Sequence, residues 1–228
     1  MLQEETVSEG NAYTSAPGIR SMTRPQLKEF AKKLLSGNWG IFVLITLVYW
    51  LCTVAVSMIP APLLFLFPQA NLLFESLNWI ISILLIPLSI GLMAVFKNFV
   101  DGKEQTVANL FDLYKDFEFA LKLIGAMVLY GIAVVLGLLL FLVPGIIIAL
   151  GFAQVVYIML DNRGIGIIDA FKKSWAMMDG YKGEYFVLNL SFLGWAILAM
   201  FTCGIGFLWL FPYMYVAYYL FYLKIKPV

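Results

Sequence analysis

The polar side chains inside long apolar runs are the first candidates for chemistry in this sequence. Gln154 lies in one such run, and Asn189 lies with Ser191 in another. At membrane depth such groups either bind a polar ligand or hydrogen-bond between helices, which contributes about 0.6–2 kcal/mol. Pro212 interrupts a further apolar run and frees a backbone carbonyl, which could line a cavity or belong to a packed kink.

A second group of candidates lies in the basic segment 161–184. Lys172, Lys173 and Lys182 border an apolar stripe that contains Phe171 and Trp175. This composition is typical of a helix that lies in an anionic membrane interface. We expect Gly180 and Lys182 to contact a phospholipid head group or a partner protein, although retention of basic residues on the cytoplasmic side also explains the lysines.

Several reaction classes are excluded by composition. The chain has no histidine, so imidazole catalysis and imidazole metal sites are absent. Cys52 and Cys203 are far apart and form no CxxC motif, and Asp112 and Asp116 read as a solvated helix face. No Asp, Glu, Lys or Arg lies deep in an apolar run, which argues against proton- or sodium-coupled pumping. We therefore expect no enzyme activity, no metal and no cofactor.

The elements that carry these residues are predicted to be membrane-spanning helices. Of the 228 residues, 62% are hydrophobic and 13% are charged, which excludes an ordinary soluble domain. A spanning helix needs about 20 apolar residues. Six runs fit: Gly40–Ile59, Leu77–Phe96, Phe119–Val143, Gly145–Leu160, Tyr185–Thr202 and Ile205–Leu223. Tight turns at Pro144-Gly145 and around Gly204 predict that spans three and four, and spans five and six, form hairpins.

The positions of the charges predict the orientation. All fifteen Lys and Arg residues fall on one side of these spans, in the terminal segments, in the joining segments or, for Lys122, in the first turn of span three. The opposite side consists of segment 60–76, with Glu75 as its one charge, and the two tight turns. Because cationic loops stay in the cytoplasm, both termini are predicted to be cytoplasmic. Residues 1–21 are polar and are expected to form a disordered cytoplasmic tail.

A threefold repeat is predicted within residues 22–228, which we expect to form a single membrane domain. A shift of 60 residues lays Asp101 over Asp161 and Pro144 over Gly204. Each unit is an amphipathic cytoplasmic helix followed by a hairpin of spans, with units of approximately 22–96, 97–160 and 161–223. Apolar residues at helical spacing predict the three helices: Leu27, Phe30, Ala31, Leu34 and Leu35; Val107, Leu110, Phe111, Tyr114 and Phe117; Ile168, Phe171, Trp175 and Met178. Thr23 and Gln26 suit a capping box for the first.

Several motifs resemble a known family. They include Leu140–Ile147 around Pro144-Gly145, Met178–Lys182, Leu190–Trp195 and Gly204-Ile205-Gly206 with Pro212-Tyr213. The chain resembles a bacterial integral-membrane family, domain-of-unknown-function family 975, over roughly residues 34–222. Phe152 and Tyr181 depart from its usual residues. The family is distantly similar to the membrane region of certain bacterial glycerophosphodiester phosphodiesterases, but six spans leave no room for their catalytic barrel, so that activity is not expected.

Taken together, the sequence predicts an all-α integral membrane protein with six transmembrane helices in three helix-plus-hairpin units. The resemblance implies the bacterial plasma membrane. We expect a non-enzymatic envelope auxiliary or scaffold protein. The alternative is a carrier or exporter of a lipid, peptide or other amphiphile, with a polar cavity around Gln154, Asn189 and Pro212. Membrane lipids and a membrane-protein partner are the expected partners, and no basic excess points to nucleic acid, since the net charge is +1.

Overall fold

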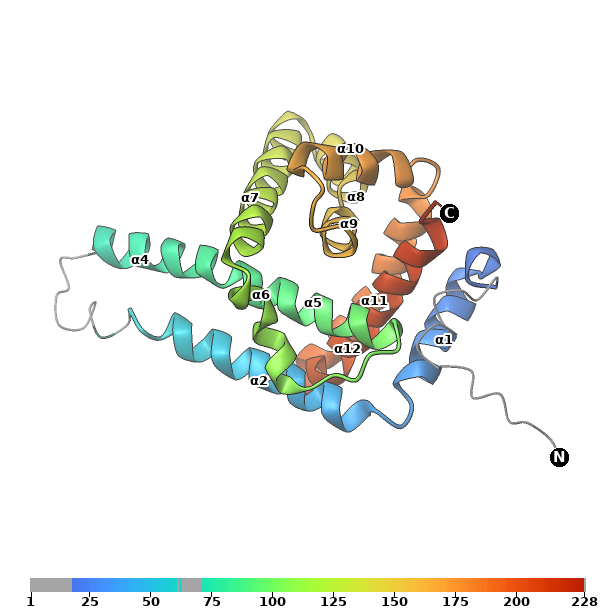
Figure 1. Cartoon of the computed structure of the whole chain (residues 1–228), viewed down its shortest axis with the longest axis horizontal. Helices are drawn as coiled ribbons and strands as arrows, with labels where there is room; N and C mark the ends of the chain where they lie inside the picture. The colour runs from blue at the N-terminus through green and yellow to red at the C-terminus, as the bar shows by residue number, and fades with distance from the viewer. Residues whose placement is uncertain (1–17, 61, 63–70, 228) are drawn as a thin grey trace.

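The structure is a computed structural model that describes residues 18–60, 62 and 71–227. Within this part the chain is helical and contains no strand (Figure 1). Two 3₁₀ helices, η2 and η3, span Ile19–Ser21 and Val107–Phe111. The α-helices are α1 Arg24–Leu35, α2 Trp39–Ser57, α4 Asn71–Leu84, α5 Ile86–Val100, α6 Asp112–Lys115, α7 Phe117–Leu140, α8 Leu142–Gly151, α9 Val155–Asp161, α10 Ile167–Met177, α11 Lys182–Phe201 and α12 Phe207–Ile225.

Five helical stretches of the described residues are long and apolar enough to cross a membrane. They are α2, Leu72–Val100, α7, Leu142–Asp161 and α11. The sixth predicted span corresponds to α12, which falls outside this group. Helix α12 carries five tyrosines, which lower its mean hydropathy below that of the leucine- and valine-rich helices: Tyr213, Tyr215, Tyr218, Tyr219 and Tyr222.

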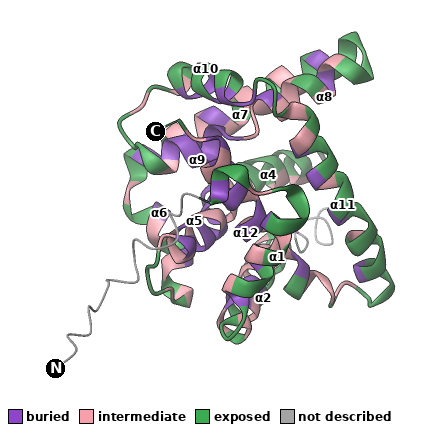
Figure 2. Ribbon diagram, turned by 90° about the vertical axis from the view of Figure 1, so that its right-hand side faces the viewer, coloured by how far each residue is buried: buried purple, intermediate pink, exposed green. Residues whose placement is uncertain are grey.

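Helix α12 lies inside the assembly instead. It packs against α1, α2, α5 and α11, and Val216, Ala217, Leu220 and Phe221 on it are fully buried. In Figure 2 the buried residues gather on α5, α9 and α12, while the outer faces of the surrounding helices are exposed. Because lipid tails are themselves apolar, those outer faces carry little cost in a bilayer. The core is therefore built around α12.

The predicted hairpin of spans three and four is confirmed as α7 followed by α8. The two helices approach so closely that a Cβ built on Gly137 would lie 2.9 Å from the Gly145 Cα. Small residues permit this contact. The predicted span Gly145–Leu160 lies within the helical stretch Leu142–Asp161, which is long and apolar enough to cross a membrane. A turn at residues 152–154 interrupts this stretch between α8 and α9.

The three predicted amphipathic helices fare differently. In α1 the capping box of Thr23 and Gln26 is present, and Leu27, Ala31 and Leu35 are buried. Helix α10 forms where it was predicted, but only Phe171 and Met178 of its predicted apolar face are buried, whereas Ile168 and Trp175 are exposed. The prediction of one helix with an apolar face over 107–117 is wrong: η3 and the one-turn α6 replace it, and Phe117 is exposed. Leu110 and Leu113 are the buried anchors there, since a 3₁₀ turn shifts which side chains share a face.

Helices α2 and α4 extend together away from the other helices, at the left of Figure 1. Apolar side chains such as Val54, Leu72 and Trp79 are exposed on them. The predicted outer segment 60–76 falls mostly on residues 61 and 63–70, which lie outside the described residues, and α4 occupies its last part. The helical path is interrupted at Leu85, two residues before Pro87 in the first turn of α5, because a proline has no backbone N–H to donate to the preceding turn.

The N-terminal prediction is only partly open to comparison. Residues 1–17 of the expected disordered tail lie outside the described residues. Order extends further toward the N-terminus than predicted, because Ile19 is buried and the Arg20 guanidinium donates a hydrogen bond of 3.2 Å to the Lys226 carbonyl oxygen. The two described ends of the chain therefore lie side by side.

Candidate functional site

Gln154 occupies the break between α8 and α9 and is fully buried. Ser174 of α10 supplies the hydrogen bonds that the break would otherwise leave unmade. The Gln154 backbone N–H donates to the Ser174 hydroxyl at 3.2 Å, and that hydroxyl donates to the Gly151 carbonyl oxygen at 2.8 Å. Unpaired buried backbone groups are costly, so these two hydrogen bonds stabilise the packing of α10 against the turn at 152–154. The Gln154 side chain itself contacts the Met178 sulfur at 3.7 Å.

Two buried polar atoms near this break have no hydrogen-bond partner among the described residues. They are the Gln154 Oε1 and the hydroxyl of Tyr157, which lies about one helical turn further along. The Tyr157 ring packs against the rings of Tyr219 and Tyr222, with centroid distances of 5.3 and 5.5 Å. An unpaired buried polar group costs about 1–3 kcal/mol. Hydrogen bonding is therefore incomplete around this break, within the part of the interior that the structure describes.

Asn189 is used in a helix contact. Its Nδ2 donates to the Tyr185 carbonyl oxygen at 2.8 Å, and the Tyr218 hydroxyl donates to its Oδ1 at 2.9 Å. This joins α11 to α12 by the interhelical hydrogen bond that was one of the two sequence interpretations. Gln154 faces α10 and Asn189 faces α12, so the structure gives them separate partners. Pro212 is buried within a continuous α12.

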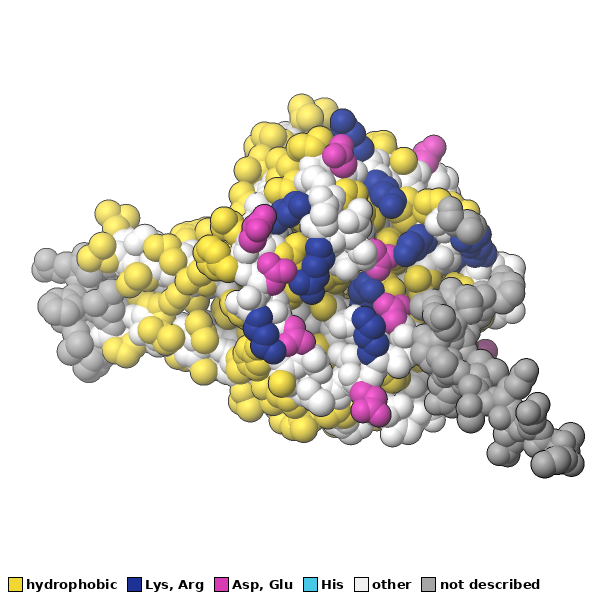
Figure 3. All heavy atoms as spheres, viewed as in Figure 1, with side chains coloured by type: hydrophobic (Ala, Val, Ile, Leu, Met, Phe, Trp, Pro, Cys, Tyr) yellow, Lys and Arg dark blue, Asp and Glu magenta, His cyan; other side chains and the backbone are white. Residues whose placement is uncertain are grey.

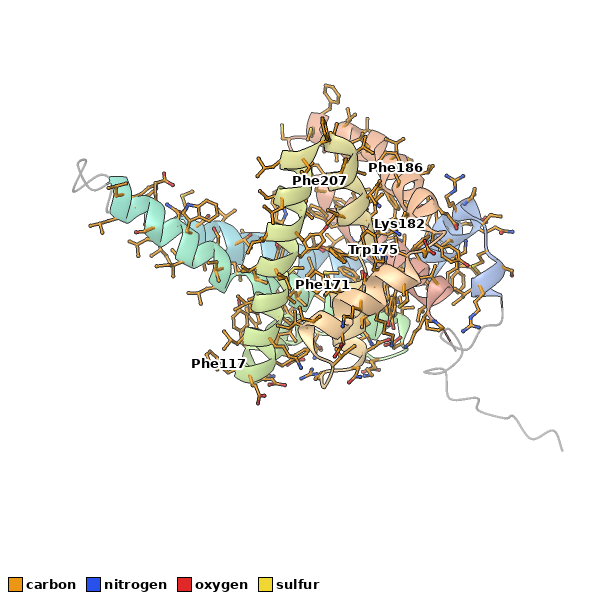
Figure 4. All side chains as sticks on the ribbon, turned by 90° about the horizontal axis from the view of Figure 1, so that it is seen from above. Phe117, Phe171, Trp175, Lys182, Phe186 and Phe207 are labelled. Atoms are coloured by element: carbon orange, nitrogen blue, oxygen red, sulfur yellow. The ribbon has the colours of Figure 1, made fainter. Side chains whose placement is uncertain are left out.

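Gly180 and Lys182 lie at the turn between α10 and α11. Gly180 has a positive φ of 74°, which glycine adopts without strain. The Lys182 ammonium lies 4.4 Å from the centre of the Trp175 ring and 3.9 Å from the Asp179 carboxylate (Figure 4). Trp175 in turn covers Gly151, where a Cβ would lie 2.4 Å from the ring. Lys182 thus helps to hold α10 on the break through a cation–π contact.

A charged cluster that the sequence did not reveal joins three helices. The Lys97 ammonium lies between two carboxylates, 2.7 Å from Asp101 and 3.0 Å from Asp161. The side chain of Lys97 is 11% exposed. Lys97 and Asp101 lie at the end of α5 and Asp161 at the end of α9. We call Lys97, Asp101 and Asp161, together with Tyr219, Tyr222 and Lys226 of the C-terminal segment, the ion-pair cluster.

The C-terminal segment completes this cluster. The Tyr219 hydroxyl donates to Asp101 and the Tyr222 hydroxyl donates to Asp161, each at 2.7 Å, and Lys226 pairs with Asp161. Each carboxylate therefore has a cation and a phenol donor. The predicted repeat was the one sequence feature that pointed to this cluster, because a shift of 60 residues superposes Asp101 on Asp161. In Figure 3 charged side chains of both signs gather on the face that is turned toward the viewer.

A groove opens on another side of the structure, between α1, the start of α2, α11 and α12. It has a volume of about 380 Å³. Three tryptophans, Trp39, Trp195 and Trp209, line it together with Tyr213, and Thr202 lies in the part formed by the turn between α11 and α12. Lys32 of α1 is its one charged lining residue. We call this the tryptophan groove.

Lys28, one helical turn before Lys32, lies beside this groove. Its ammonium donates to the Ser191 hydroxyl at 3.2 Å and lies 4.5 Å from the centre of the Phe192 ring and 6.0 Å from that of Tyr213. Burial lowers the pKa of Lys28 below its usual value. Ser191 lies in the middle of α11, so α1 carries a cation to the middle of a helix that is long and apolar enough to cross a membrane. Among the described residues, no carboxylate is ion-paired with Lys28 or Lys32.

Comparison with known proteins gives one match. No curated protein and no solved structure matches the chain. Residues 125–228, from α7 to the C-terminus, match the sequence profile of a family described as "Protein of unknown function (DUF975)". This part contains every motif quoted for the resemblance, the break at Gln154, and both Asn189 and Lys182. The resemblance to domain-of-unknown-function family 975 that the motifs predicted is confirmed over residues 125–228.

Proposed function

We propose that the chain is a non-enzymatic, multi-pass protein of the bacterial plasma membrane that acts as an envelope auxiliary or scaffold. The observation that carries this proposal is the use of the interior polar groups. The ion-pair cluster, Asn189 and Ser174 all connect one helix to another. Groups saturated in this way stabilise an arrangement of helices and are not positioned to react. A rigid helical assembly with apolar flanks suits a role in holding partners.

Six spans with both termini in the cytoplasm are part of this proposal. The contact between Arg20 and the Lys226 carbonyl supports it, because ends on the same side require an even number of crossings. Five apolar helices and α12 together supply that number. The placement of Lys and Arg on one side of the sequence gives the direction.

The threefold unit arrangement, approximately 22–96, 97–160 and 161–223, is likewise proposed. Its support is that the two aspartates superposed by the 60-residue shift both contact Lys97. Equivalent residues of two successive units thus converge on one cation. This is expected where units related by an axis along the membrane normal meet at the cytoplasmic side.

Partner recognition is assigned to the outer face of α10 and the turn that contains Gly180 and Lys182. Lys172 and Lys173 are exposed there. To test this role, tagged protein in native-lipid discs is purified and everything that copurifies is identified by mass spectrometry, against an unrelated six-span protein. A stoichiometric partner that is lost in Lys172→Ala/Lys173→Ala or Lys182→Ala, and kept in Lys115→Ala, supports the proposal. Absence of any stoichiometric partner contradicts it.

The orientation has its own test at Cys203, which is exposed in the turn between α11 and α12. In a Cys52→Ser background it is the one remaining thiol. A membrane-impermeant maleimide is expected to label it in intact cells from outside. Labelling only after the cells are opened would contradict cytoplasmic termini.

A carrier or exporter of an amphiphile remains the second candidate. The tryptophan groove favours the carrier, because its mostly apolar lining and its one charged residue, Lys32, match the apolar and polar parts of an amphiphile. The cavity expected around Gln154, Asn189 and Pro212 does not support the carrier function, because these three residues contact different helices. Net movement of a fluorescent lipid across vesicles that contain the purified protein would favour the carrier, and its absence would favour the scaffold.

A further inference from the structure

A second cavity lies between the first turn of α1, the first turn of α11 and the end of α12, close to the two described ends of the chain (Figure 1). It has a volume of about 710 Å³. A phosphoglycerol head group of about eleven non-hydrogen atoms, each given the share of one water, about 30 Å³, fills about 330 Å³. The cavity is therefore large enough for a phospholipid head group. We call it the terminal cavity, and its lining consists of residues 21–25, Gly183, Glu184, Val187 and Lys224.

The charges that line the terminal cavity leave one cation without a counter-charge. Lys224 is ion-paired with Glu184, and both line the cavity. Arg24, the third charged lining residue, has no carboxylate partner within the part of the chain that the structure describes. A guanidinium presents a planar fork of N–H donors that matches the oxygens of a phosphate group. The cavity therefore combines room for a head group with an unpaired cation for its phosphate.

The surface that continues from the cavity along α11 is apolar and exposed. Gly183, Val187 and Leu190 follow one another at i, i+4 and i+7, so they lie on one face of the helix. Val187 is 40% exposed and Leu190 is 53% exposed. Helix α11 is long and apolar enough to cross a membrane, and in the proposed orientation it leads from the cytoplasmic surface toward the bilayer interior. A lipid with its phosphate at Arg24 thus keeps its head group at the cytoplasmic surface and its acyl chains in the hydrocarbon.

We infer that the terminal cavity binds the head group of an anionic phospholipid of the cytoplasmic leaflet, with the lipid phosphate at the Arg24 guanidinium and the acyl chains along α11. Charge complementarity selects an anionic lipid, because two cations and one carboxylate line the cavity. The choice of leaflet rests on the proposed orientation. The scaffold role is not required, since the proposed partner surface lies on α10 and the turn after it, so the two proposals fail separately.

The test uses native mass spectrometry, which resolves the first lipid bound to the full chain from later ones. Phosphatidylglycerol or phosphatidylcholine is added at increasing concentration to the protein in detergent. A basic residue near the membrane surface contributes about 1 kcal/mol to the attraction of anionic lipid, which is about fivefold in affinity. The first phosphatidylglycerol is therefore expected to bind about fivefold more tightly than the first phosphatidylcholine, and Arg24→Ala is expected to remove this preference.

Two matched pairs of variants separate the cavity from general charge and from unfolding. Lys33→Ala removes one exposed cation from the other end of α1 and is expected to keep the preference. Gly183→Leu fills the cavity without a change of charge, because a Cβ at Gly183 meets nothing within 4 Å, and is expected to weaken binding of the first lipid. Gly194→Leu makes the same change in open space further along α11 and is expected to bind as the wild type does. Leucine favours a helix over glycine, so neither variant should unfold more easily.

Four results would overturn the inference. They are equal affinity of the wild type for the two lipids, an unchanged preference in Arg24→Ala, an equal loss of preference in Lys33→Ala, and wild-type lipid binding in Gly183→Leu. Inorganic phosphate at the concentration of the lipid distinguishes a lipid site from a site for a free anion. Phosphatidylglycerol is expected to remain bound in its presence, and displacement by the phosphate would overturn the assignment to a lipid.

Discussion

Lys97 and Lys28 have different surroundings in this protein. Lys97 lies between Asp101 and Asp161 in the ion-pair cluster. Lys28 contacts a hydroxyl and aromatic rings beside the tryptophan groove and has no carboxylate partner among the described residues. A neutralised cation stabilises helix contacts, whereas a cation without a counter-charge attracts one from outside the chain. We therefore expect the first region to contribute more to stability than the second.

The largest effect is expected for Lys97→Met. The substitution leaves Asp101 and Asp161 close together without the cation between them, and removing one partner of a buried ion pair costs about 3–5 kcal/mol. Thermal unfolding in detergent should show a clearly lower midpoint than the wild type. Lys115→Ala is the control, because the Lys115 side chain is 73% exposed and its pair with Asp112 contributes little. Equal midpoints for the two variants would refute the structural role of the cluster.

A smaller loss is expected for Tyr219→Phe and Tyr222→Phe. Each removes one hydroxyl donor from a carboxylate of the cluster but leaves the cations in place. Each variant should lower the free energy of unfolding by about 1 kcal/mol, and because both share the cluster their losses should not add. Additive losses in the double variant would show that Asp101 and Asp161 act independently. Chemical unfolding in mixed micelles measures this.

Ser191→Asp converts the second region into a copy of the first. It places a carboxylate beside the Lys28 ammonium, where the hydroxyl now lies 3.2 Å away. The paired lysine should then stabilise the contact between α1 and α11, so the unfolding midpoint of Ser191→Asp should lie above that of Ser191→Asn, the matched neutral control. A midpoint of Ser191→Asp at or below that of Ser191→Asn would show that Lys28 gains nothing from a counter-charge at this position.

The smallest effect on stability is expected for Lys28→Met in zwitterionic lipid. Burial lowers the pKa of Lys28, so the charged form is disfavoured in the folded state and methionine should raise the unfolding midpoint slightly at pH 7. Because the folded pKa lies below the unfolded one, this destabilisation disappears as the pH rises through the folded pKa. The gap between variant and wild type should therefore narrow toward pH 10. A gap that widens would have the wrong sign.

The sequence predicted local features of this fold better than long-range ones. The capping box at Thr23, the hairpin at Pro144 and helix α10 follow from spacing and turn chemistry over a few residues. The break at Gln154 could not be predicted, because it depends on Ser174 of α10, and the residues on both sides of it are uniformly apolar. Propensity over an apolar run favours a continuous helix unless a neighbour supplies the lost hydrogen bonds.

The candidate sites show the same limit. Asn189 was correctly singled out as polar at depth, but its partner Tyr218 depends on how α11 meets α12. Lys28 was expected on a helix at the membrane surface, and only the packing of α1 along α12 brings it to Ser191. Asp101 and Asp161 were visible as repeat positions, yet their convergence on Lys97 required the third dimension.

The most direct test of the contrast between the two regions is one set of thermal unfolding curves. Wild type, Lys97→Met and Lys28→Met are each unfolded in discs of phosphatidylcholine. Lys97→Met should unfold at a clearly lower temperature than the wild type, because it leaves Asp101 and Asp161 without the cation between them. Lys28→Met should unfold at the wild-type temperature or slightly above it, because it removes a cation that has no carboxylate partner among the described residues. A midpoint for Lys28→Met that falls as far as that of Lys97→Met would contradict the contrast between the two regions.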